Sequence, residues 1–277
     1  MRARYLALFV PVLGIVAIQL GLADGSQNQT GQIYKGDQIN KAREQKNDPY
    51  WQRALQETYH SPEELVAQDA RERRRGQTLK KIMRGDPDRP VLALTFDDGP
   101  HPDLTLRLLD ILKTEKVKAT FFVIGKMVEA HPELLKAIAA DGHCIGNHTF
   151  SHVTLTKIPM GDILTEYQAN NDLIKQVIHK DVHFCRPPGG DYDPMVIQAA
   201  TDCGLTTVLW TDDPGDYSNP GSNVIEERTL ARLSNGGIIL LHDGVKETLD
   251  VLPQIIDYAK KRGFRFVTLD ELAKERD

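Results

Sequence analysis

Two histidines and an aspartate carry the first chemical signal in this sequence. His148 and His152 are four residues apart, so on a helix both rings would project from one face as two nitrogen ligands of one metal ion. Such a pair alone is commonly structural or exposed, and a third ligand is needed. Asp98 can supply an oxygen. Two histidines and one carboxylate leave part of the coordination sphere open to water and substrate.

The predicted ion is divalent, with zinc as the first choice and cobalt, nickel, manganese or iron as alternatives. An ion of this kind lowers the pKa of bound water to about 7 and polarises a carbonyl oxygen. The three residues therefore predict metal-assisted hydrolysis.

A second carboxylate, Asp97, directly precedes the candidate ligand Asp98. Neighbouring residues on a regular strand point to opposite faces, but a turn at Gly99 relaxes this rule at the strand end. One acid can then bind the metal while the other faces the attacking water as general base. Arg186 is the candidate that holds this base ionised and oriented, since a guanidinium favours the charged form of a nearby carboxylate. An Asp-Asp-Gly sequence alone also fits a capped turn.

His242 ends the apolar run 238–241 and is the candidate general acid. A lone histidine in such a place is commonly structural, but the acid role is open to it once metal and base are assigned elsewhere. Asp216 can orient His242 and stabilise its cationic form, as the carboxylate does in a serine-protease triad. Amide hydrolysis needs a base for the water and an acid for the departing amine, and this set supplies both.

The elements that must position these residues alternate between strands and helices. Short apolar runs followed by stretches of helical spacing predict a parallel sheet. The candidate polar residues follow the runs at their carboxyl ends, which in a parallel barrel form the face that carries the chemistry. About seven such units predict an α/β fold, a distorted or incomplete (β/α) barrel, with a doubly wound open sheet as the alternative. The predicted strands are 91–96, 120–124, 144–147, 182–185, 205–210, 237–241 and 264–268, and the predicted helices lie within 104–115, 132–140, 161–179, 194–202, 224–233 and 249–262.

Taken together, these residues resemble the polysaccharide deacetylases, carbohydrate esterase family four with the NodB-homology domain. The similarity covers residues 88–276. That family has five ordered motifs, and this sequence has a counterpart to each. The counterparts are Thr95-Phe96-Asp97-Asp98-Gly99, His148-Thr149-Phe150-Ser151-His152, Arg186-Pro187-Pro188-Gly189-Gly190, Asp213-Pro214-Gly215-Asp216-Tyr217 and Leu240-Leu241-His242.

The resemblance implies a distorted (β/α) barrel and the metal-dependent removal of N-acetyl groups from an amino-sugar polymer. It implies that Asp98, His148 and His152 bind the metal. It implies that Asp97 is the general base supported by Arg186, and that His242 is the general acid tuned by Asp216. It also implies that the backbone N–H of Gly189 helps to stabilise the tetrahedral oxyanion. Leu240 and the aromatic residue of the fourth motif, here Tyr217, are implied to line the acetyl pocket.

Two positions depart from the family pattern. The fourth motif usually ends in tryptophan, and the smaller ring and hydroxyl of Tyr217 predict a looser or more polar acetyl pocket. Cys144 stands where the family often has a glutamate just before the histidines, and we expect it to be a small buried packing group. Cys185 and Cys203 are likewise expected to be core thiols beside strands.

Composition excludes several classes of protein. The 277 residues carry 34 Lys and Arg against 39 Asp and Glu, a net charge of −5, which argues against a strongly basic nucleic-acid-binding protein. The hydrophobic fraction of 40% supports a sizeable core, and three cysteines cannot form a disulfide scaffold. A single apolar run approaches membrane length, which argues against a multi-pass membrane protein.

The predicted organisation has three parts. Basic residues precede a long uncharged run at the start, so residues 1–23 are predicted to be a signal peptide or a membrane anchor. Residues 24–88 are a polar linker and a charged helical spacer; its helical character is expected over 41–84, and Ser61-Pro62-Glu63-Glu64 has the form of a helix start. Residues 89–277 are the predicted catalytic domain.

The predicted activity is hydrolysis that releases acetate from an N-acetylated glycan: peptidoglycan, a chitin-like oligomer or an exopolysaccharide. Alternatives are an O-deacetylase acting on acetylxylan or another acetyl ester, a carbohydrate-binding pseudoenzyme, and an enzyme of this fold acting on small cyclic amides. The export segment predicts a periplasmic, secreted or outward-facing anchored protein. No nucleic-acid partner is expected, and the oligomeric state is left open.

Overall fold

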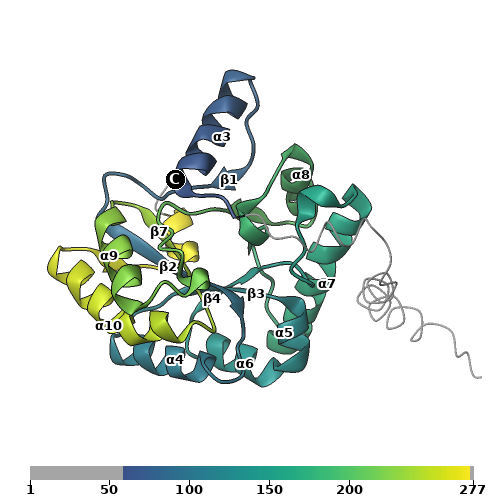
Figure 1. The fold of residues 1–277 in the computed structure, drawn as a ribbon. Helices are drawn as coiled ribbons and strands as arrows, with labels where there is room; N and C mark the ends of the chain where they lie inside the picture. The colour runs from purple at the N-terminus through teal and green to yellow at the C-terminus, as the bar shows by residue number, and fades with distance from the viewer. Residues whose placement is uncertain (1–58, 275–277) are drawn as a thin grey trace, which may run out of the picture.

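A single parallel sheet organises the protein. The structure is a computed structural model that describes residues 59–274, so the predicted export segment 1–23 lies outside the described residues. Within the described part, eight strands pair in the order β1-β6-β5-β4-β3-β2-β7, and β8 pairs with β2 (Figure 1). They are β1 (Lys81–Ile82), β2 (Val91–Gly99), β3 (Thr120–Val123), β4 (Cys144–Asn147), β5 (Phe184–Cys185), β6 (Thr206–Val208), β7 (Gly237–His242) and β8 (Arg265–Phe266).

The sheet curls into an incomplete barrel. β1 and β7 are the last strands on its two sides, and all pairs between named strands are parallel. The chain that follows β6 returns to β7 through an isolated parallel bridge between Asp212 and Ile239. The prediction of a distorted or incomplete (β/α) barrel is therefore confirmed, and the doubly wound open sheet is not observed.

Helices connect the strands and cover the outside of the barrel, as the crossover connections of a parallel sheet require. In Figure 1, α4, α6 and α10 lie along one side of the barrel, and α3 projects beside β1. Side-chain capping explains two starts. One is Ser61 before α3; the other is Asp193, which accepts a hydrogen bond from the Val196 N–H at 2.9 Å, with Pro194 at the first position of α8. The helices are α3 (Pro62–Arg74), α4 (Thr105–Thr114), α5 (Gly125–Ala130), α6 (Pro132–Ala140), α7 (Met160–Ile178), α8 (Pro194–Asp202), α9 (Ser222–Arg232), α10 (Lys246–Lys261) and α11 (Leu269–Lys274).

Side chains of β2 alternate between two hydrophobic cores. Leu94 and Phe96 belong to the core that the sheet shares with the outer helices. Ala93 belongs to a second core, together with Phe122 and Leu240. Because strand residues two apart share a face, Asp97 follows Ala93 toward the barrel interior. The same rule places His242 of β7 on the side of Leu240, so the two polar side chains lie on one face.

The predicted charged helix 41–84 is partly wrong over residues 59–84, and its first part, 41–58, lies outside the described residues. The start at Ser61 is confirmed, because the Glu64 N–H donates to Ser61 Oγ at 3.2 Å and the Ser61 N–H to Glu64 Oε2 at 2.8 Å. The helix, however, ends at Arg74, and Lys81–Ile82 is a strand that pairs with β6. A two-residue strand in a charged stretch has too few residues to show a period, so the sequence did not reveal it.

Two short helices, α5 and α11, were also not predicted, because each has only six residues. The expectation for the thiols holds for Cys144 and Cys185, which are buried, whereas Cys203 is half-buried at the end of α8. Among the described residues, no helix has both the length and the apolar content needed to cross a bilayer.

Candidate active site

Two consecutive aspartates reach the same site because β2 is irregular at its end. Regular alternation would turn Asp98 away from Asp97, but Asp98 has a φ of 71°. The pairing with β3 also shifts between Phe96 and Gly99. A side chain at Gly99 would collide with the buried Asp243 carboxylate, so glycine is required where the strand turns. The backbone therefore delivers both carboxylates to the carboxyl face.

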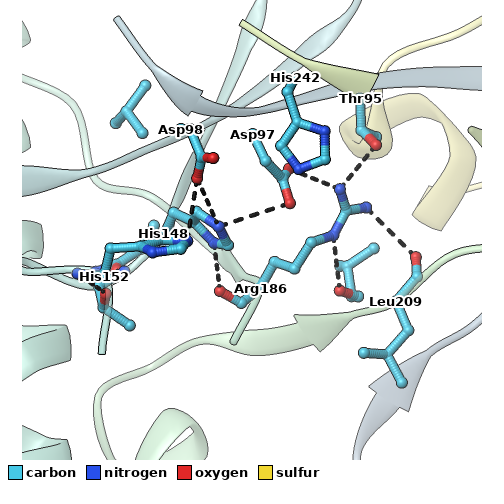
Figure 2. A network of polar contacts seen from close by, with 12 residues as sticks. Thr95, Asp97, Asp98, His148, His152, Arg186, Leu209 and His242 are labelled. Carbon is cyan, nitrogen blue, oxygen red and sulfur yellow. Dashed lines mark hydrogen bonds and ion pairs between the residues drawn. The ribbon is translucent and has the colours of Figure 1, made fainter. Parts of the chain in front are cut away.

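Asp98, His148 and His152 converge as the sequence predicts. Asp98 Oδ1 lies 3.3 Å from His148 Nε2 and 3.1 Å from His152 Nε2 (Figure 2). Within residues 59–274, these three form the single group of metal-ligating side chains whose atoms all lie within 4.8 Å of one another. The helical arrangement considered for the two histidines is wrong: Thr149 and His152 have φ values of 65° and 55° and form a loop.

A polar scaffold holds this histidine loop. The Thr149 N–H donates to Asn147 Oδ1 at 2.7 Å, and the His152 N–H donates to Thr149 Oγ1 at 2.9 Å. Asn170 of α7 donates to the Thr149 carbonyl at 2.9 Å, and Glu166 of α7 accepts from the Ser151 N–H at 2.7 Å. These hydrogen bonds replace the ladder of a helix, so the left-handed residues keep satisfied backbone groups.

The donor set fits a divalent cation. His148 Nδ1 lies 2.8 Å from the Arg186 carbonyl oxygen, and an Nδ1–H that donates there leaves the Nε2 lone pair directed at Asp98. Asp98 Oδ1 is buried and has no hydrogen-bond partner of regular geometry. Burial tends to raise the pKa of the Asp98 carboxyl, but the adjoining His148 and His152 imidazoles outweigh it and hold the pKa well below its usual range. An ionised oxygen between two ring nitrogens is the environment that a metal ion completes.

Asp97 forms a buried ion pair with Arg186. Arg186 Nη1 donates to Asp97 Oδ1 at 2.7 Å and to Thr95 Oγ1 at 2.8 Å. The guanidinium is fully buried and lies 4.3 Å from the centre of the Phe122 ring. The other carboxylate oxygen, Asp97 Oδ2, lies 3.7 Å from His148 Nε2 (Figure 2). One oxygen is thus held by the pair while the second faces the ligand cluster.

Asp216 and His242 form a second buried pair. His242 Nδ1 lies 2.7 Å from Asp216 Oδ1, and the His242 backbone N–H donates to Asp216 Oδ2 at 2.9 Å. Thr248 of α10 donates to the same Oδ2 at 2.7 Å. Burial alone would lower the pKa of His242, but the Asp216 carboxylate outweighs it and raises the pKa to about 9. The Asp216 carboxylate therefore favours the protonated imidazole, which is the form that can donate a proton.

The three residues implied to bind substrate differ in position. The Tyr217 ring and the His242 ring meet edge to face, with centroids 5.3 Å apart. Gly189 adopts the left-handed conformation with φ 62° and ψ 8°, in a short turn that follows Arg186. Leu240 is buried in the barrel interior, two residues before His242 on the same face.

Sequence reasoning missed residues that support these groups. Thr95 lies within the first motif, but nothing in the sequence shows that its hydroxyl contacts Arg186. Thr248 lies on a later helix and carries no local signal for its bond to Asp216. Asn147 and Asn170 are common residue types whose role in the histidine loop depends on the packing of α7.

An incomplete parallel barrel with an Asp-His-His cluster and two buried acid–base pairs at its carboxyl face defines a class of α/β protein suited to hydrolysis. Comparison with known proteins agrees with this class. Residues 84–208 match the family model described as polysaccharide deacetylase. Together with the relatives below, this match shows that the chain belongs to the polysaccharide deacetylase family.

Relatives and solved structures cover the described barrel. A peptidoglycan-N-acetylglucosamine deacetylase of Bacillus cereus is 37% identical over 189 residues, which are 66% of this chain and 88% of the relative. A chitooligosaccharide deacetylase of Sinorhizobium fredii is 34% identical over 67% of this chain and 93% of its own. The crystal structure of a CE4 family pseudoenzyme from Bacillus anthracis matches with a TM-score of 0.69 and 28% identity, covering 73% of this chain and 71% of its own.

Proposed function

We propose that this protein is a metal-dependent hydrolase that removes N-acetyl groups from an amino-sugar polymer and releases acetate. One observation carries the proposal: three groups converge at one barrel face. They are the ligand cluster, the Asp97–Arg186 pair, which suits a general base, and the His242–Asp216 pair, which suits a general acid. Membership of the polysaccharide deacetylase family and the relatives that act on peptidoglycan and chitooligosaccharides support it.

Asp98, His148 and His152 would hold the ion, and zinc is the ion that we propose, with cobalt, nickel, manganese and iron as alternatives. When bound, a divalent ion of this kind activates water and polarises a carbonyl oxygen. The set supplies one oxygen and two nitrogens, which suits zinc and leaves further coordination positions for ligands other than protein.

The protein's own groups move the protons. Asp97 accepts a proton from the water that adds to the acetyl carbonyl carbon, while Arg186 balances the charge of Asp97 and fixes its orientation. His242, held by Asp216, donates a proton to the glycan nitrogen as the carbon–nitrogen bond breaks. Acetate and the amino sugar leave, and the amine carries the additional proton as an ammonium group. Asp97 then releases the proton that it took from water, and His242 regains one, so both groups return to their starting states.

Three further residues would bind the reacting group. The backbone N–H of Gly189 stabilises the tetrahedral oxyanion as a preorganised donor. Tyr217 and Leu240 line the pocket for the acetyl methyl group, and the place of Tyr217 beside His242 supports this role. The smaller ring at Tyr217, where the family usually has tryptophan, favours a more open pocket.

We further propose that the substrate lies outside the cytoplasm. Residues 1–23 would direct export as a signal peptide or membrane anchor, residues 24–88 would link them to the barrel, and residues 89–277 would carry catalysis. Strand β1 falls within the spacer 24–88 and pairs with β6, so the spacer also contributes a strand to the sheet. Peptidoglycan, chitin-like oligomers and exopolysaccharides are the candidate substrates.

The similarity to a pseudoenzyme makes loss of activity the second candidate. A pseudoenzyme of this family would be expected to lack a ligand or an acid–base group, whereas every such group is present and connected in this chain. The intact set therefore favours an active hydrolase over a glycan-binding protein.

The test is acetate release by the full chain loaded with zinc, measured on chitin oligomers, peptidoglycan and acetylxylan. We expect acetate from the N-acetylated glycans and newly free amines in their mass spectra, with the Asp97→Asn variant as the inactive control. Acetate from acetylxylan alone would replace the proposal with an O-deacetylase. If none of these glycans released acetate, the result would favour the second candidate, a glycan-binding pseudoenzyme.

A further inference from the structure

Three aromatic rings are in contact one after another, beginning with the imidazole of the candidate acid His242. Tyr217 lies edge-on to His242, and the ring of Tyr59 stacks on Tyr217 with centroids 4.2 Å apart and an angle of 8° between the planes. Tyr59 precedes the first helix of the described structure and lies outside all five sequence motifs. A residue of the predicted spacer thus contacts the ring that lies against the candidate acid.

The residue after Tyr59 fastens this segment to the loop that carries the candidate oxyanion donor. The His60 N–H donates to the Gly189 carbonyl at 3.0 Å. His60 Nε2 lies 3.6 Å from Asp191 Oδ1, and the other Asp191 oxygen accepts from Thr156 at 2.7 Å. The segment is therefore attached on the side of Gly189 as well as on the side of Tyr217.

Helix α3 holds the same segment from its other end. The helix begins at Pro62 behind the Ser61–Glu64 capping box, and Leu65 is fully buried in the barrel-side core. Gln68 Nε2 donates to the Tyr192 carbonyl at 2.9 Å. On the opposite side, Glu63 pairs with Arg232 of α9 at 2.6 Å. These contacts give Tyr59 a fixed position, as a wall of a binding site requires.

We infer that Tyr59 is a specificity-determining residue, which forms with Tyr217 an aromatic wall that binds a pyranose ring next to the residue being deacetylated. The inference rests on the proposed function, because it names the part of the glycan that this wall contacts. Aromatic faces pack against apolar C–H surfaces, and a tyrosine has a hydroxyl that suits a wet rim. Tyr59 is half-buried, so part of its surface remains accessible.

The wall also accounts for the tyrosine in the fourth motif. Tyr217 offers less aromatic area than the tryptophan usual in the family, and Tyr59 supplies a second ring in parallel contact with it. Because the two rings cover each other's inner faces, we place the neighbouring sugar of a polymer against the outer face of Tyr59. The binding contribution should therefore grow with the length of the glycan.

The test compares the full chain with its Tyr59→Phe, Tyr59→Leu and Tyr59→Ala variants. Calorimetry measures binding of N-acetylglucosamine oligomers of increasing length, and acetate release gives kcat and KM on the same ladder. We expect Tyr59→Ala and Tyr59→Leu to weaken binding and raise KM about 3- to 10-fold on the longer oligomers. The shortest substrate and kcat should change little, and Tyr59→Phe should stay near the parent.

Tyr258→Ala is the matched control, because this exposed tyrosine lies near the end of the outer helix α10. Its binding, KM and melting temperature should equal those of the parent, and the melting temperature shows whether each Tyr59 variant is folded. Equal binding by Tyr59→Ala and the parent at every length would overturn the inference. Tighter binding or faster turnover in Tyr59→Ala would also overturn it, since Tyr59 would then cover the site.

The two proposals fail in different ways. A parent protein that binds the glycan ladder but releases no acetate would overturn the proposed function, and the calorimetric comparison of the Tyr59 variants would still decide the role of the wall. A parent that releases acetate while all variants keep its KM would overturn the wall alone. If the parent bound no oligomer at all, the proposed role of Tyr59 and Tyr217 in glycan binding would also be refuted.

Discussion

The ligand cluster and the two acid–base pairs occupy the same barrel face but are built differently. Asp98, at the irregular end of β2, and His152, in the loop after β4, have left-handed backbone conformations, and their side chains are 34% and 16% exposed. Arg186 and Asp216 have fully buried side chains, and their partners Asp97 and His242 belong to the ends of β2 and β7. His148, the third cluster residue, is as buried as the two pairs, so the contrast in exposure and backbone geometry rests on Asp98 and His152.

The difference lies in what completes each region. Both pairs satisfy their charges with protein groups alone, through Thr95 and Thr248 as well as the partner residue. The cluster leaves the ionised Asp98 Oδ1 between two ring nitrogens without a regular hydrogen bond. This contrast supports the proposal that the fold preorganises Asp97 and His242 for proton transfer and leaves the cluster to be completed by an ion.

The largest expected effect follows from breaking the cluster. His152→Ala removes one of three ligands, so we expect bound zinc to fall from one per chain to background and acetate release to fall with it. Elemental analysis of the purified protein and an acetate assay measure both. His131→Ala, a histidine outside the cluster, should change neither. Full activity in a metal-free His152→Ala protein would refute the ligand assignment.

An isosteric pair of variants sharpens the comparison. Asp97→Asn should retain zinc and lose turnover by about 10²- to 10⁴-fold, because it removes the proposed general base. It also leaves Arg186 buried without its counter-charge, which costs about 3–5 kcal/mol of stability. Asp98→Asn should instead lose zinc. The reverse result, with metal lost in Asp97→Asn, would mean that the two aspartates exchange roles.

The smallest of these effects concerns the second pair and depends on pH. A raised pKa keeps His242 protonated up to about 9, so turnover should fall as pH rises through that value. In Asp216→Asn the pKa moves toward 6.5, the ordinary value for histidine, and at pH 8 turnover should fall roughly 30-fold. Near pH 5.5 the two proteins should differ little. If the pH profiles of turnover for the parent and Asp216→Asn were parallel, Asp216 would not be the residue that raises the pKa of His242.

The same pair makes stability depend on pH. Because the folded-state pKa of His242 lies above its unfolded value, the pair contributes its full stability below about pH 6.5. That contribution is lost as pH rises through about 9. Asp216→Asn should lower the melting temperature below pH 6.5 and flatten its change toward pH 9, which thermal unfolding across this range measures.

Much of the site could be predicted from the sequence because polar residues directly follow apolar runs. Asp97, Asp98 and His242 end strands that the apolar pattern predicts, and parallel strands bring their carboxyl ends together. The loop of His148 and His152 was not predictable in the same way. A spacing of four fits a helix, and the left-handed residues that build the loop depend on hydrogen bonds from α7.

Other features depend on contacts between distant segments. Tyr59 meets Tyr217 only because α3 is anchored by Leu65 and β1 is paired with β6. Nothing in the residues near Tyr59 indicates a ring partner so far along the chain. The two-residue β1 itself carries no period that a sequence pattern could show.

The sequence by itself determined which residue types are available for the chemistry and on which strand ends they fall, because alternating apolar runs specify a parallel barrel and its carboxyl face. The tertiary structure decided which side chains meet. The left-handed turn at Asp98, the buried partners of Asp97 and His242, and the stack of Tyr59 on Tyr217 all arise from packing between segments far apart in the chain. Local pattern fixes the elements, whereas distances between functional atoms depend on how those elements pack.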